Sequence, residues 1–432
     1  MSMSCCHPEP RWGRGLPAAR YAWRGLPLIV AVLVAALASC DLFEDDSGSS
    51  KKKIKSQPYS TTESVTPGAV TTSAAGAVEI SASIPVESVA VGIVAYGTDD
   101  EWKFIEHAGL WLGGDDNITG PDGPVPLSFN ILNGGPAPST LNNQAVAVHF
   151  PNNGFAATLK KGTYRIPVGA ANSSSGALVV DTINSAVFYK TKTSQKPTLK
   201  LNVFVLNGTS GSITSQVAAE ADPEIAGAIN VLQNVYAGNA AIDVNVDVSI
   251  QYLDDTSLGN CLATSPGDIS TEAEQFCLLR SYPQIPTNDA MNIFVISSLD
   301  YIDPANPGAG VIGLAAGIPG PFNMQGFATS GTMAEYQGDG VGTILGFTLA
   351  HEFGHFLGLF HTSQTNNSAS GIIGEDPIED TPVCKTSQVQ QSLFECPDFG
   401  NLMFPFVDEE SDPPITTGQG NVVKFNPGIT VP

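Results

Sequence analysis

Apolar residues in the C-terminal half of the chain alternate between strand-like runs and helical repeats. Short alternating or β-branched runs predict strands, and apolar residues three to four positions apart predict helices. The predicted strands are Thr198–Leu206, Ile242–Leu253 and Met291–Ser297. The predicted helices are Ala218–Ala237 and Thr343–Leu357. This order predicts an α+β domain over residues 197–432.

The preceding region, residues 76–190, shows short alternating runs broken by Gly, Pro and Asn, with no long helical repeat. The runs are Ala77–Val86, Ser88–Ala95, Ala145–Phe150, Gly162–Val168 and Ala177–Tyr189. They predict an all-β, sandwich-like domain. His107 and His149 fall in this domain, away from any catalytic grouping, and are predicted to be ordinary packed or surface histidines.

Residues 1–39 have the pattern of an export signal. Arginines precede an apolar run, Leu26–Ala38, that is shorter than the roughly 20 residues of a membrane-spanning helix. Small residues then precede Cys40, which is typical of a bacterial lipoprotein signal in which this cysteine is lipidated and becomes the new N-terminus. A plain secretory signal is the alternative. The protein is predicted to be exported and lipid-anchored to a bacterial membrane, on its periplasmic or cell-surface face.

Residues 40–75 are rich in Ser, Thr, Gly and Lys and have almost no apolar periodicity. Such a composition cannot bury enough apolar surface to fold by itself. The segment is therefore predicted to be a flexible tether between the signal and the β domain.

The charge balance of the chain limits its partners. The sequence has 19 Lys and Arg residues against 42 Asp and Glu residues, which gives a net charge of −23 at pH 7. So acidic a chain is repelled by phosphate backbones, which excludes nucleic acid as a partner. It is compatible with the binding of divalent cations.

The strongest chemical signal is an eleven-residue stretch at the end of the second predicted helix. His351 and His355 are four residues apart, so on a helix their imidazoles face one point and can bind one metal ion. Glu352 is placed to take a proton from a metal-bound water. Gly358 tolerates left-handed backbone angles and can end the helix in a sharp turn, after which His361 supplies a third nitrogen.

A single histidine in a buried helix is usually a packing residue. Here three of the six histidines in the chain fall within one short stretch, beside a glutamate. Three histidine ligands leave a fourth coordination position for water, as in catalytic zinc sites, whereas structural sites are closed and rich in cysteine. The stretch therefore predicts a catalytic zinc site.

The stretch resembles the extended zinc signature of the metzincin clan of peptidases, and the residues after it resemble the pappalysin branch. Asp380-Thr381-Pro382 is similar to the Asp-Thr-Pro segment of that branch, and Asn401-Leu402-Met403 to its methionine turn beneath the zinc. The resemblance covers residues 197–432. It implies a zincin-like metzincin fold, with a mixed twisted sheet and an active-site helix, and it makes Met403 the methionine of the turn.

Two features of the resemblance concern substrate. Pappalysins usually carry a tyrosine shortly after the methionine, whereas this chain has Phe404-Pro405-Phe406. Zinc and Glu352 can polarise a carbonyl and activate water without that tyrosine. The Gly- and Ala-rich segment Ala309–Pro321 corresponds to the edge strand that pairs with an extended substrate in metzincins, although its composition equally fits a plain loop.

Four cysteines follow Cys40, an even number that agrees with an oxidising compartment. The closest pairing joins Cys261 with Cys277 and Cys384 with Cys396. The second disulfide would brace the segment between the third zinc ligand and the methionine turn. Zinc ligation by these cysteines is the competing interpretation, but their spacing is not that of a zinc ribbon or knuckle.

An acidic cluster follows the third histidine, where pappalysin-like proteins can hold structural calcium. Its members are Glu375, Asp376, Glu379 and Asp380. We therefore expect a calcium site that involves Asp376 and Asp380, with solvated acids as the alternative.

The basic joint Lys190–Lys196 separates the two domains and is a candidate site for proteolytic nicking. Because zymogens are common among metzincins, one hypothesis is that the β domain is an inhibitory prosegment released by cleavage near Lys192. The alternative is a permanent spacer or binding domain.

The sequence as a whole predicts a zinc-dependent endopeptidase that hydrolyses peptide bonds of extracellular or periplasmic proteins. Its substrates would be proteins or peptides, attacked by zinc-bound water with assistance from Glu352. The alternative is a surface-anchored binding lipoprotein with a vestigial or structural zinc site.

Overall fold

The structure is a computed structural model that describes part of the chain. The described residues are 3–4, 54–73, 78–97, 103–107, 112–113, 119–120, 123–124, 145–155, 159–172, 177–254, 261, 267–281, 290–299, 311–323, 326–327, 330–363, 376–384, 388, 392–407 and 413–431. The chain divides into one unit of Met1–Pro8 with Ile54–Pro432 and a second unit of Glu9–Lys53. The predicted signal, with Cys40, lies outside the described residues.

A five-stranded mixed sheet organises the C-terminal half. Its strands in spatial order are β15 (Asn245–Leu253), β14 (Thr198–Leu206), β16 (Met291–Ile296), β18 (Thr332–Glu335) and β17 (Gly313–Ala315). The first four are parallel, and β17 pairs antiparallel with β18 at the edge. The strand predicted over Thr198–Leu206 is confirmed at both ends. The segment Ala309–Pro321 thus contains a short edge strand.

Two helices replace the single helix predicted over Ala218–Ala237. They are α3 (Gln216–Ala221) and α4 (Pro223–Gln233), and α4 continues into a π-helical turn, η2 (Asn234–Gly238). The prediction is wrong at Asp222, whose backbone is extended and whose side chain accepts hydrogen bonds from Glu224 N and Ile225 N as the N-cap of α4. Pro223 then occupies the first position of α4, where its missing N–H costs nothing.

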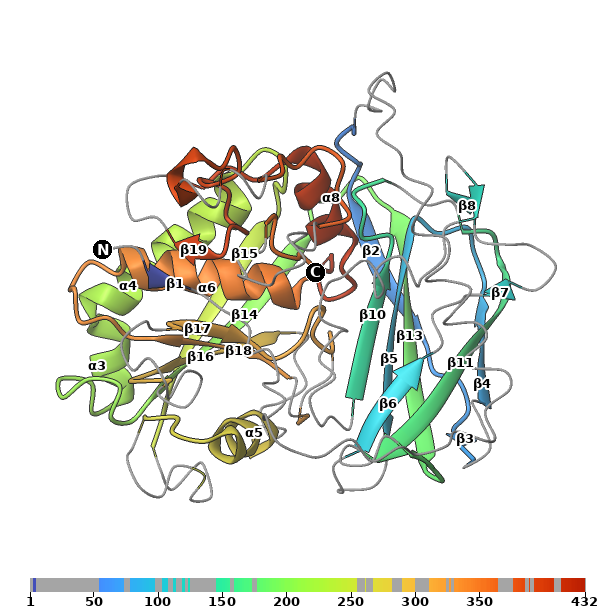
Figure 1. The fold of residues 1–432 in the computed structure, drawn as a ribbon, viewed down its shortest axis with the longest axis horizontal. Helices are drawn as coiled ribbons and strands as arrows, with labels where there is room; N and C mark the ends of the chain where they lie inside the picture. Colours follow the sequence, from blue (N-terminus) through green and yellow to red (C-terminus); the bar gives the residue numbers. More distant parts are fainter. Residues whose placement is uncertain are drawn as a thin grey trace. The chain divides into compact units, whose positions relative to one another are not determined.

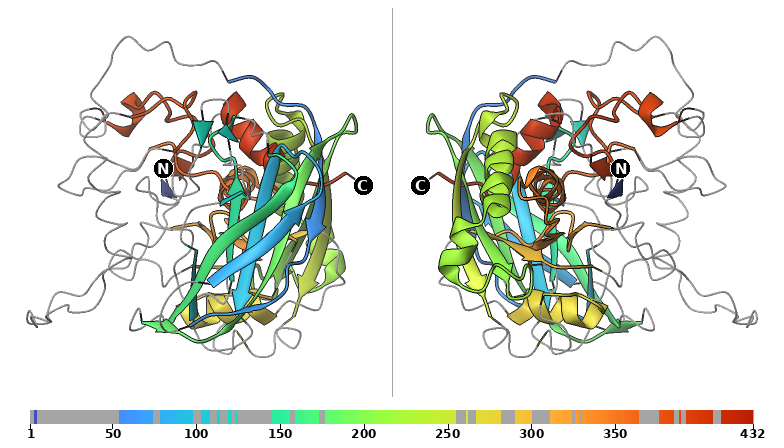
Figure 2. Two further views of the ribbon diagram at one scale, coloured as in Figure 1. Left: turned by 90° about the vertical axis from the view of Figure 1, so that its right-hand side faces the viewer. Right: turned by 90° about the vertical axis from the view of Figure 1, so that its left-hand side faces the viewer.

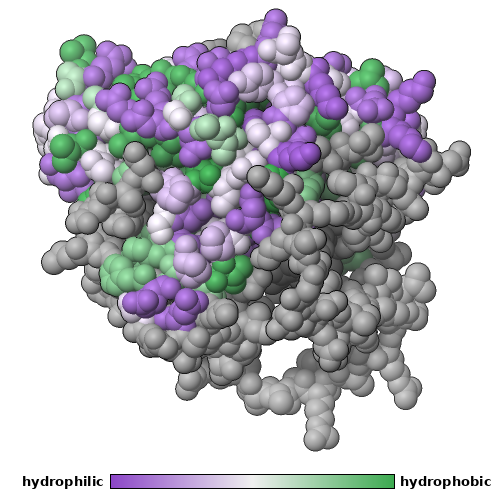
Figure 3. All heavy atoms as spheres, turned by 90° about the horizontal axis from the view of Figure 1, so that it is seen from above, coloured by the Kyte–Doolittle hydropathy of each residue, from purple (hydrophilic) through white to green (hydrophobic). Residues whose placement is uncertain are grey.

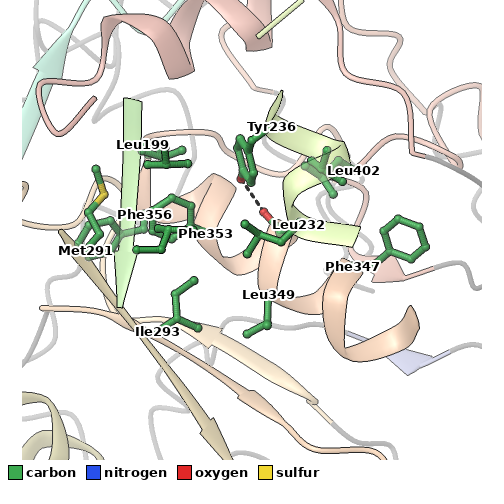
Figure 4. Close-up of a cluster of buried hydrophobic side chains, with 14 of the residues drawn as sticks. Leu199, Leu232, Tyr236, Met291, Ile293, Phe347, Leu349, Phe353, Phe356 and Leu402 are labelled. Carbon is green, nitrogen blue, oxygen red and sulfur yellow. Dashed lines mark hydrogen bonds between the residues drawn. The ribbon is translucent and has the colours of Figure 1, made fainter. Parts of the chain in front are cut away.

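The long helix α6 (Thr343–Phe356) contacts α4, β17 and β18 (Figure 1). It has the bounds predicted from the sequence to within one residue. Figure 4 shows that Phe353 and Leu349 of α6 lie in a buried apolar cluster with Leu232 of α4 and Ile293 of β16. This packing fixes the helix against the sheet.

Tyr236, from η2, adds a polar contact within that cluster. Its hydroxyl donates a hydrogen bond of 2.8 Å to the carbonyl of Ala350, the residue before His351 (Figure 4). Tyr236 is fully buried, and burial raises the pKa of its hydroxyl. A protonated phenol can donate, so this bond holds α6 at the point where the predicted metal ligands begin.

The loop before α6 is built on a buried carboxylate. Glu224 of α4 is 0% exposed, and its oxygens accept hydrogen bonds from the backbone N–H groups of Gln337, Gly338 and Gly340. Charge-assisted bonds of this kind are stronger than neutral ones. They shape the chain between β18 and α6.

The N-terminal half contains two antiparallel sheets (Figure 2). The first holds β10 (Ala145–Phe150), β5 (Ala90–Gly97), β13 (Thr182–Lys192), β2 (Ser60–Val65) and β3 (Val70–Thr71). The second holds β12 (Leu178–Val179), β11 (Gly162–Asn172), β4 (Val78–Ile84), β6 (Lys103–His107) and β7 (Leu112–Gly113). Ile80 and Ile84 of β4 share one buried cluster with Val91 and Ile93 of β5, so the sheets face each other as a sandwich.

Strands β2 and β3 lie within residues 40–75, where the sequence predicts a flexible tether. Six residues of β2 pair with β13 from Val187 to Lys192. Five of the six residues of β2 are polar, so it has no apolar alternation that a sequence pattern could detect. Backbone hydrogen bonds to β13, rather than buried side chains, determine its conformation.

The remaining described elements are short or peripheral. They are α5 (Glu272–Ser281), α8 (Thr417–Phe425), the 3₁₀ turn η3 (Leu393–Glu395), and two strand pairs, β1 (Met3–Ser4) with β19 (Phe406–Val407) and β8 (Thr119–Gly120) with β9 (Gly123–Pro124). No helix in the described ranges has the length and apolarity needed to cross a membrane. On the face drawn in Figure 3, hydrophilic and hydrophobic residues are interspersed over the described part.

Candidate metal centre

The C-terminal half of α6 presents His351 and His355 one turn apart. Both side chains are buried, at 0% and 2% exposure. Their ring centroids lie 4.8 Å apart, with the rings nearly perpendicular. The helical spacing thus brings the two imidazoles to one point, as the sequence predicts.

The helix ends in a tight turn at Gly358, which has a φ of +106°. The N–H of Gly358 bonds to His355 O at 2.8 Å, and the N–H of Leu359 bonds to Gly354 O at 2.9 Å. A glycine at this left-handed position is a common helix end, because it carries no Cβ to strain the backbone. The turn reverses the chain and places His361 beside the two helical histidines.

Three imidazole nitrogens converge after this turn. His361 Nε2 lies 3.2 Å from His351 Nε2 and 3.0 Å from His355 Nε2. The three residues form a buried group of metal-ligating side chains. A tetrahedral zinc ion with bonds of about 2.0–2.1 Å separates its ligand nitrogens by about 3.3–3.4 Å, so this spacing fits zinc.

The second nitrogen of each helical histidine determines which nitrogen faces the metal position. His351 Nδ1 lies 2.6 Å from Leu402 O, and His355 Nδ1 lies 2.7 Å from Leu359 O. A carbonyl oxygen can only accept, so each Nδ1 carries the proton and donates it. The Nε2 lone pairs of both residues are then directed at the shared point, which is the arrangement that metal-ligating histidines use.

Glu352 lies next to the histidines and is 4% exposed. Burial raises the pKa of its carboxyl group to about 8, while a hydrogen bond from the backbone of Ala315 in β17 opposes the shift. Gly313, also in β17, leaves room for this side chain: a Cβ there would lie 2.7 Å from Glu352 Cγ and 2.9 Å from Glu352 Oε1. The edge strand and the glutamate are therefore in direct contact.

Met403 lies beneath the helix in a turn held by several bonds. A Cβ on Gly354 would lie 2.6 Å from Met403 Sδ. Because glycine has no Cβ, the thioether can pack directly on α6. The N–H of Met403 bonds to Asn401 Oδ1 at 2.9 Å, and Met403 O accepts from Thr362 N at 3.1 Å. The turn thus contacts α6 between the two helical histidines and also braces the residue after His361.

Phe404, where pappalysins usually have a nearby tyrosine, is fully buried. Its ring packs against Phe399 and Phe406, with centroids 5.3 Å and 6.1 Å apart, in a cluster with Cys384 and Cys396. The aromatic residue therefore packs in the buried cluster around the Cys384–Cys396 pair.

Both predicted disulfides are present. Cys261 pairs with Cys277, and Cys384 pairs with Cys396. Because disulfide sulfurs are not thiolates, the alternative that these cysteines bind zinc is wrong, even though Cys384 and Cys396 lie near the carboxylate of Asp398.

The acidic residues after His361 are partly described. Asp376 Oδ1 accepts from Ile378 N at 3.2 Å, and Asp380 Oδ2 accepts from Gly418 N at 2.9 Å in the first turn of α8. Burial raises the pKa of Asp376 well above its usual value. Within the described ranges, neither residue belongs to a group of three metal-ligating side chains. Glu375 lies outside them.

Comparison with protein families gives a match over the segment that contains this site. Residues 322–405 match the peptidase family described as pregnancy-associated plasma protein-A. The match includes the three histidines, Glu352 and Met403. This segment is similar to the pappalysin-like peptidases of the metzincin clan. Peptidases of that family are zinc-dependent, and His351, His355 and His361 form a group that could hold such an ion.

No curated protein matches the chain, and two solved structures are weakly similar to it. The Bacillus subtilis protein YXIM is 8% identical, with 54% of this chain and 66% of that chain covered and a TM-score of 0.15. A family two carbohydrate esterase from Cellvibrio japonicus is 12% identical, with 56% and 69% covered and a TM-score of 0.14. The chain spans about two thirds of the length of these structures. TM-scores this low carry no argument about the fold.

Several residues at the site carry no sequence signal of their own. Gly313 and Ala315 contact Glu352, and Tyr236 holds α6, but each is an ordinary residue in an apolar or Gly-rich run. They become recognisable only when strands from different parts of the chain meet at the helix. His149, predicted to be an ordinary histidine, is buried beside Gly358.

Proposed function

We propose that the protein is a pappalysin-like, zinc-dependent endopeptidase with a metzincin fold. The observation that carries the proposal is the convergence of three histidine nitrogens within 3.0–3.2 Å, next to a buried glutamate. When bound, zinc would polarise the scissile carbonyl and lower the pKa of the attacking water. Histidines 351, 355 and 361 would hold it.

Glu352 performs the proton transfers in this mechanism. In its ionised form the carboxylate accepts a proton from the attacking water and then delivers it to the leaving amine. The backbone N–H of Ala315 orients this carboxylate, because it bonds to it from β17. Phe404 is in the core, so the proposed mechanism uses no tyrosine after the methionine turn.

The proposed substrates are proteins or peptides in an extended conformation. β17 is the last strand of its sheet, and its residues Gly313 and Ala315 face Glu352. A peptide that adds to this edge as a further strand would run past the general base. The alternative of a binding protein with a structural zinc site loses support, because a three-histidine ligand set leaves a coordination position open.

The experiment that tests the proposal is hydrolysis of casein by the purified protein, with and without a zinc chelator. We expect hydrolysis that falls to background with the chelator and returns when zinc is added. A matched sample treated with the same chelator already saturated with zinc controls for effects of the chelator other than zinc removal. Inertness of the zinc-loaded protein toward casein, gelatin and broad peptide libraries would contradict the endopeptidase function.

We also propose export and lipid anchoring at Cys40, on the outer side of a bacterial membrane. The support is the sequence alone: arginines, the apolar run Leu26–Ala38, and small residues before the cysteine. In a bacterial host, labelled palmitate should be incorporated into the wild type and lost in Cys40→Ser. Equal labelling of the two proteins would refute the anchor.

A structural calcium ion near Asp376 and Asp380 is a further proposal, supported by the acidic residues and by burial of Asp376. Calcium would relieve the cost of burying this carboxylate in its charged form. We expect a lower Tm when calcium is removed from the zinc-loaded protein. An unchanged Tm would contradict the calcium site, and the role of Asp380 would then be its hydrogen bond to the first turn of α8.

A further inference from the structure

We propose that Lys190 of the β domain acts through Asn426 to position the turn between the second and third zinc ligands. It follows that the β domain stays bound to the C-terminal half and is not a prosegment that leaves after cleavage. The inference rests on the proposed zinc site. It concerns a connection from β13 to the end of α6 that involves neither the ligands nor Glu352.

The first step of this connection is a buried lysine. Lys190 lies in β13 and is 0% exposed. Its Nζ donates hydrogen bonds to Asn426 O at 2.9 Å and to Ile429 O at 2.6 Å. Burial lowers the pKa of this amino group to about 7. Whether charged or neutral, a buried amino group is unfavourable unless it is bonded, so these two carbonyls of the C-terminal segment are specific partners.

The second step runs from Asn426 to α6. Asn426 is the C-cap of α8 and is 0% exposed. Its Nδ2 donates to Leu357 O at 3.0 Å, while its Oδ1 accepts from Gly428 N at 2.8 Å. Leu357 is the C-cap of α6, and the last carbonyls of a helix have no partner within the helix. Asn426 therefore provides the partner that fixes this turn.

A second contact from the β domain reaches the same turn. A Cβ on Gly358 would lie 2.6 Å from His149 Cε1 and 2.9 Å from His149 Nδ1, so the imidazole of β10 lies directly on this glycine. Burial lowers the pKa of His149 to about 3, so the ring is neutral at physiological pH. The side of Gly358 that faces the β domain is thus covered by an uncharged, close-packed ring.

The wider contact between the halves is apolar and close. A Cβ on Gly92 of β5 would lie 2.4 Å from Phe322 and 2.5 Å from Pro427, and the rings of Phe188 and Phe322 pack edge to face at 5.4 Å. Asn421 Nδ2 also donates to Gly154 O at 2.8 Å. Departure of the β domain would expose these surfaces and remove the partners of buried polar groups.

The contacts disfavour the hypothesis that the β domain is a prosegment cleaved in the basic joint. Lys190 and Lys192 are not in a loop, because β13 pairs with β2 up to Lys192. Lys196 forms an ion pair of 2.6 Å with Asp243. Cleavage at the exposed residues Ser194 and Gln195 would leave the domain contact intact.

The positioning role is tested by zinc affinity, measured by competition with a chromophoric chelator. Lys190→Met removes the ammonium group and keeps the length of the side chain; Lys192→Met, on the exposed part of the same strand, is the matched control. We expect zinc binding about tenfold weaker in Lys190→Met, the lower end of the range for partners outside the ligand set, and wild-type affinity in Lys192→Met. Wild-type affinity in folded Lys190→Met would overturn the role.

Asn426→Asp provides a second variant should the lysine substitution prevent folding. It keeps the acceptor for Gly428 N and removes the donor to Leu357 O at constant volume. We expect a similar loss of zinc affinity when the variant is measured at a temperature well below its own Tm, where it is folded. A purely structural role would lower the Tm and leave the affinity of the folded protein unchanged, and that result would also overturn the proposal.

Permanence of the β domain is tested by a nick. A specific protease site inserted between Ser194 and Gln195 allows the folded, full-length protein to be cut. We expect the two pieces to elute together with unchanged zinc affinity; separation, with zinc retained by the C-terminal piece, would overturn permanence. Failure of the wild type to bind zinc would instead refute the proposed function. In that case, co-elution of the two pieces would still show whether the β domain stays bound after cleavage.

Discussion

Replacement of Glu352 by glutamine is expected to lower kcat for peptide hydrolysis by about 10²–10⁴-fold, the usual contribution of a positioned general acid and base. Glutamine has the same shape as glutamate but cannot accept a proton from water and return it. The three histidines are unchanged, so zinc content should stay at the wild-type level. Single-turnover kinetics together with metal analysis measure both quantities.

Glu220→Gln is the matched control for this substitution. Glu220 lies exposed on α3, where it accepts a hydrogen bond from Gln216 Nε2. Its replacement should leave kcat unchanged. A Glu352→Gln protein that retains zinc and more than a tenth of wild-type kcat would show that another group carries the proton.

Gly313→Ala should lower kcat/KM by about 10²-fold, the effect of a misplacement of about 1 Å near the reacting groups. The new methyl group would lie 2.6 Å from Thr348 Cγ2 and 2.7 Å from Glu352 Cγ, closer than carbon atoms approach. Either the glutamate or the edge strand must move. Zinc affinity should remain that of the wild type, because none of the ligands is touched.

Gly211→Ala is the control for the added methyl group. A Cβ at Gly211 would meet nothing within 4 Å. Its activity should equal that of the wild type, and chelator competition should report the same zinc affinity for all three proteins. If Gly313→Ala were as active as Gly211→Ala, the contact between β17 and the general base would have no role in catalysis.

The sequence predicts those parts of the site that depend on local geometry. Helical spacing alone brings His351 and His355 together, and a glycine at a left-handed position explains how His361 returns to them. The strand Thr198–Leu206 is found as predicted because apolar and polar residues alternate up to Asn202 and a fully apolar run from Val203 to Leu206 follows.

Contacts between distant segments could not be predicted in the same way. Lys190 looks like part of a solvated basic joint, yet its partners lie more than 200 residues later in the chain. β2 has no apolar alternation, because its conformation depends on backbone bonds to β13. At Asp222 the apolar repeat continues across a helix break, and only the Asp-Pro pair marks the boundary.

The bond from Lys190 to Asn426 spans 236 positions of the chain. During synthesis, the sandwich is therefore complete well before the carbonyls that its lysine requires have been made. Until they arrive, the amino group of Lys190 has water in place of these two carbonyls. Folding of the two halves is thus coupled in time, because the turn after α6 receives its hydrogen bond from Asn426 only when the end of the chain has been made.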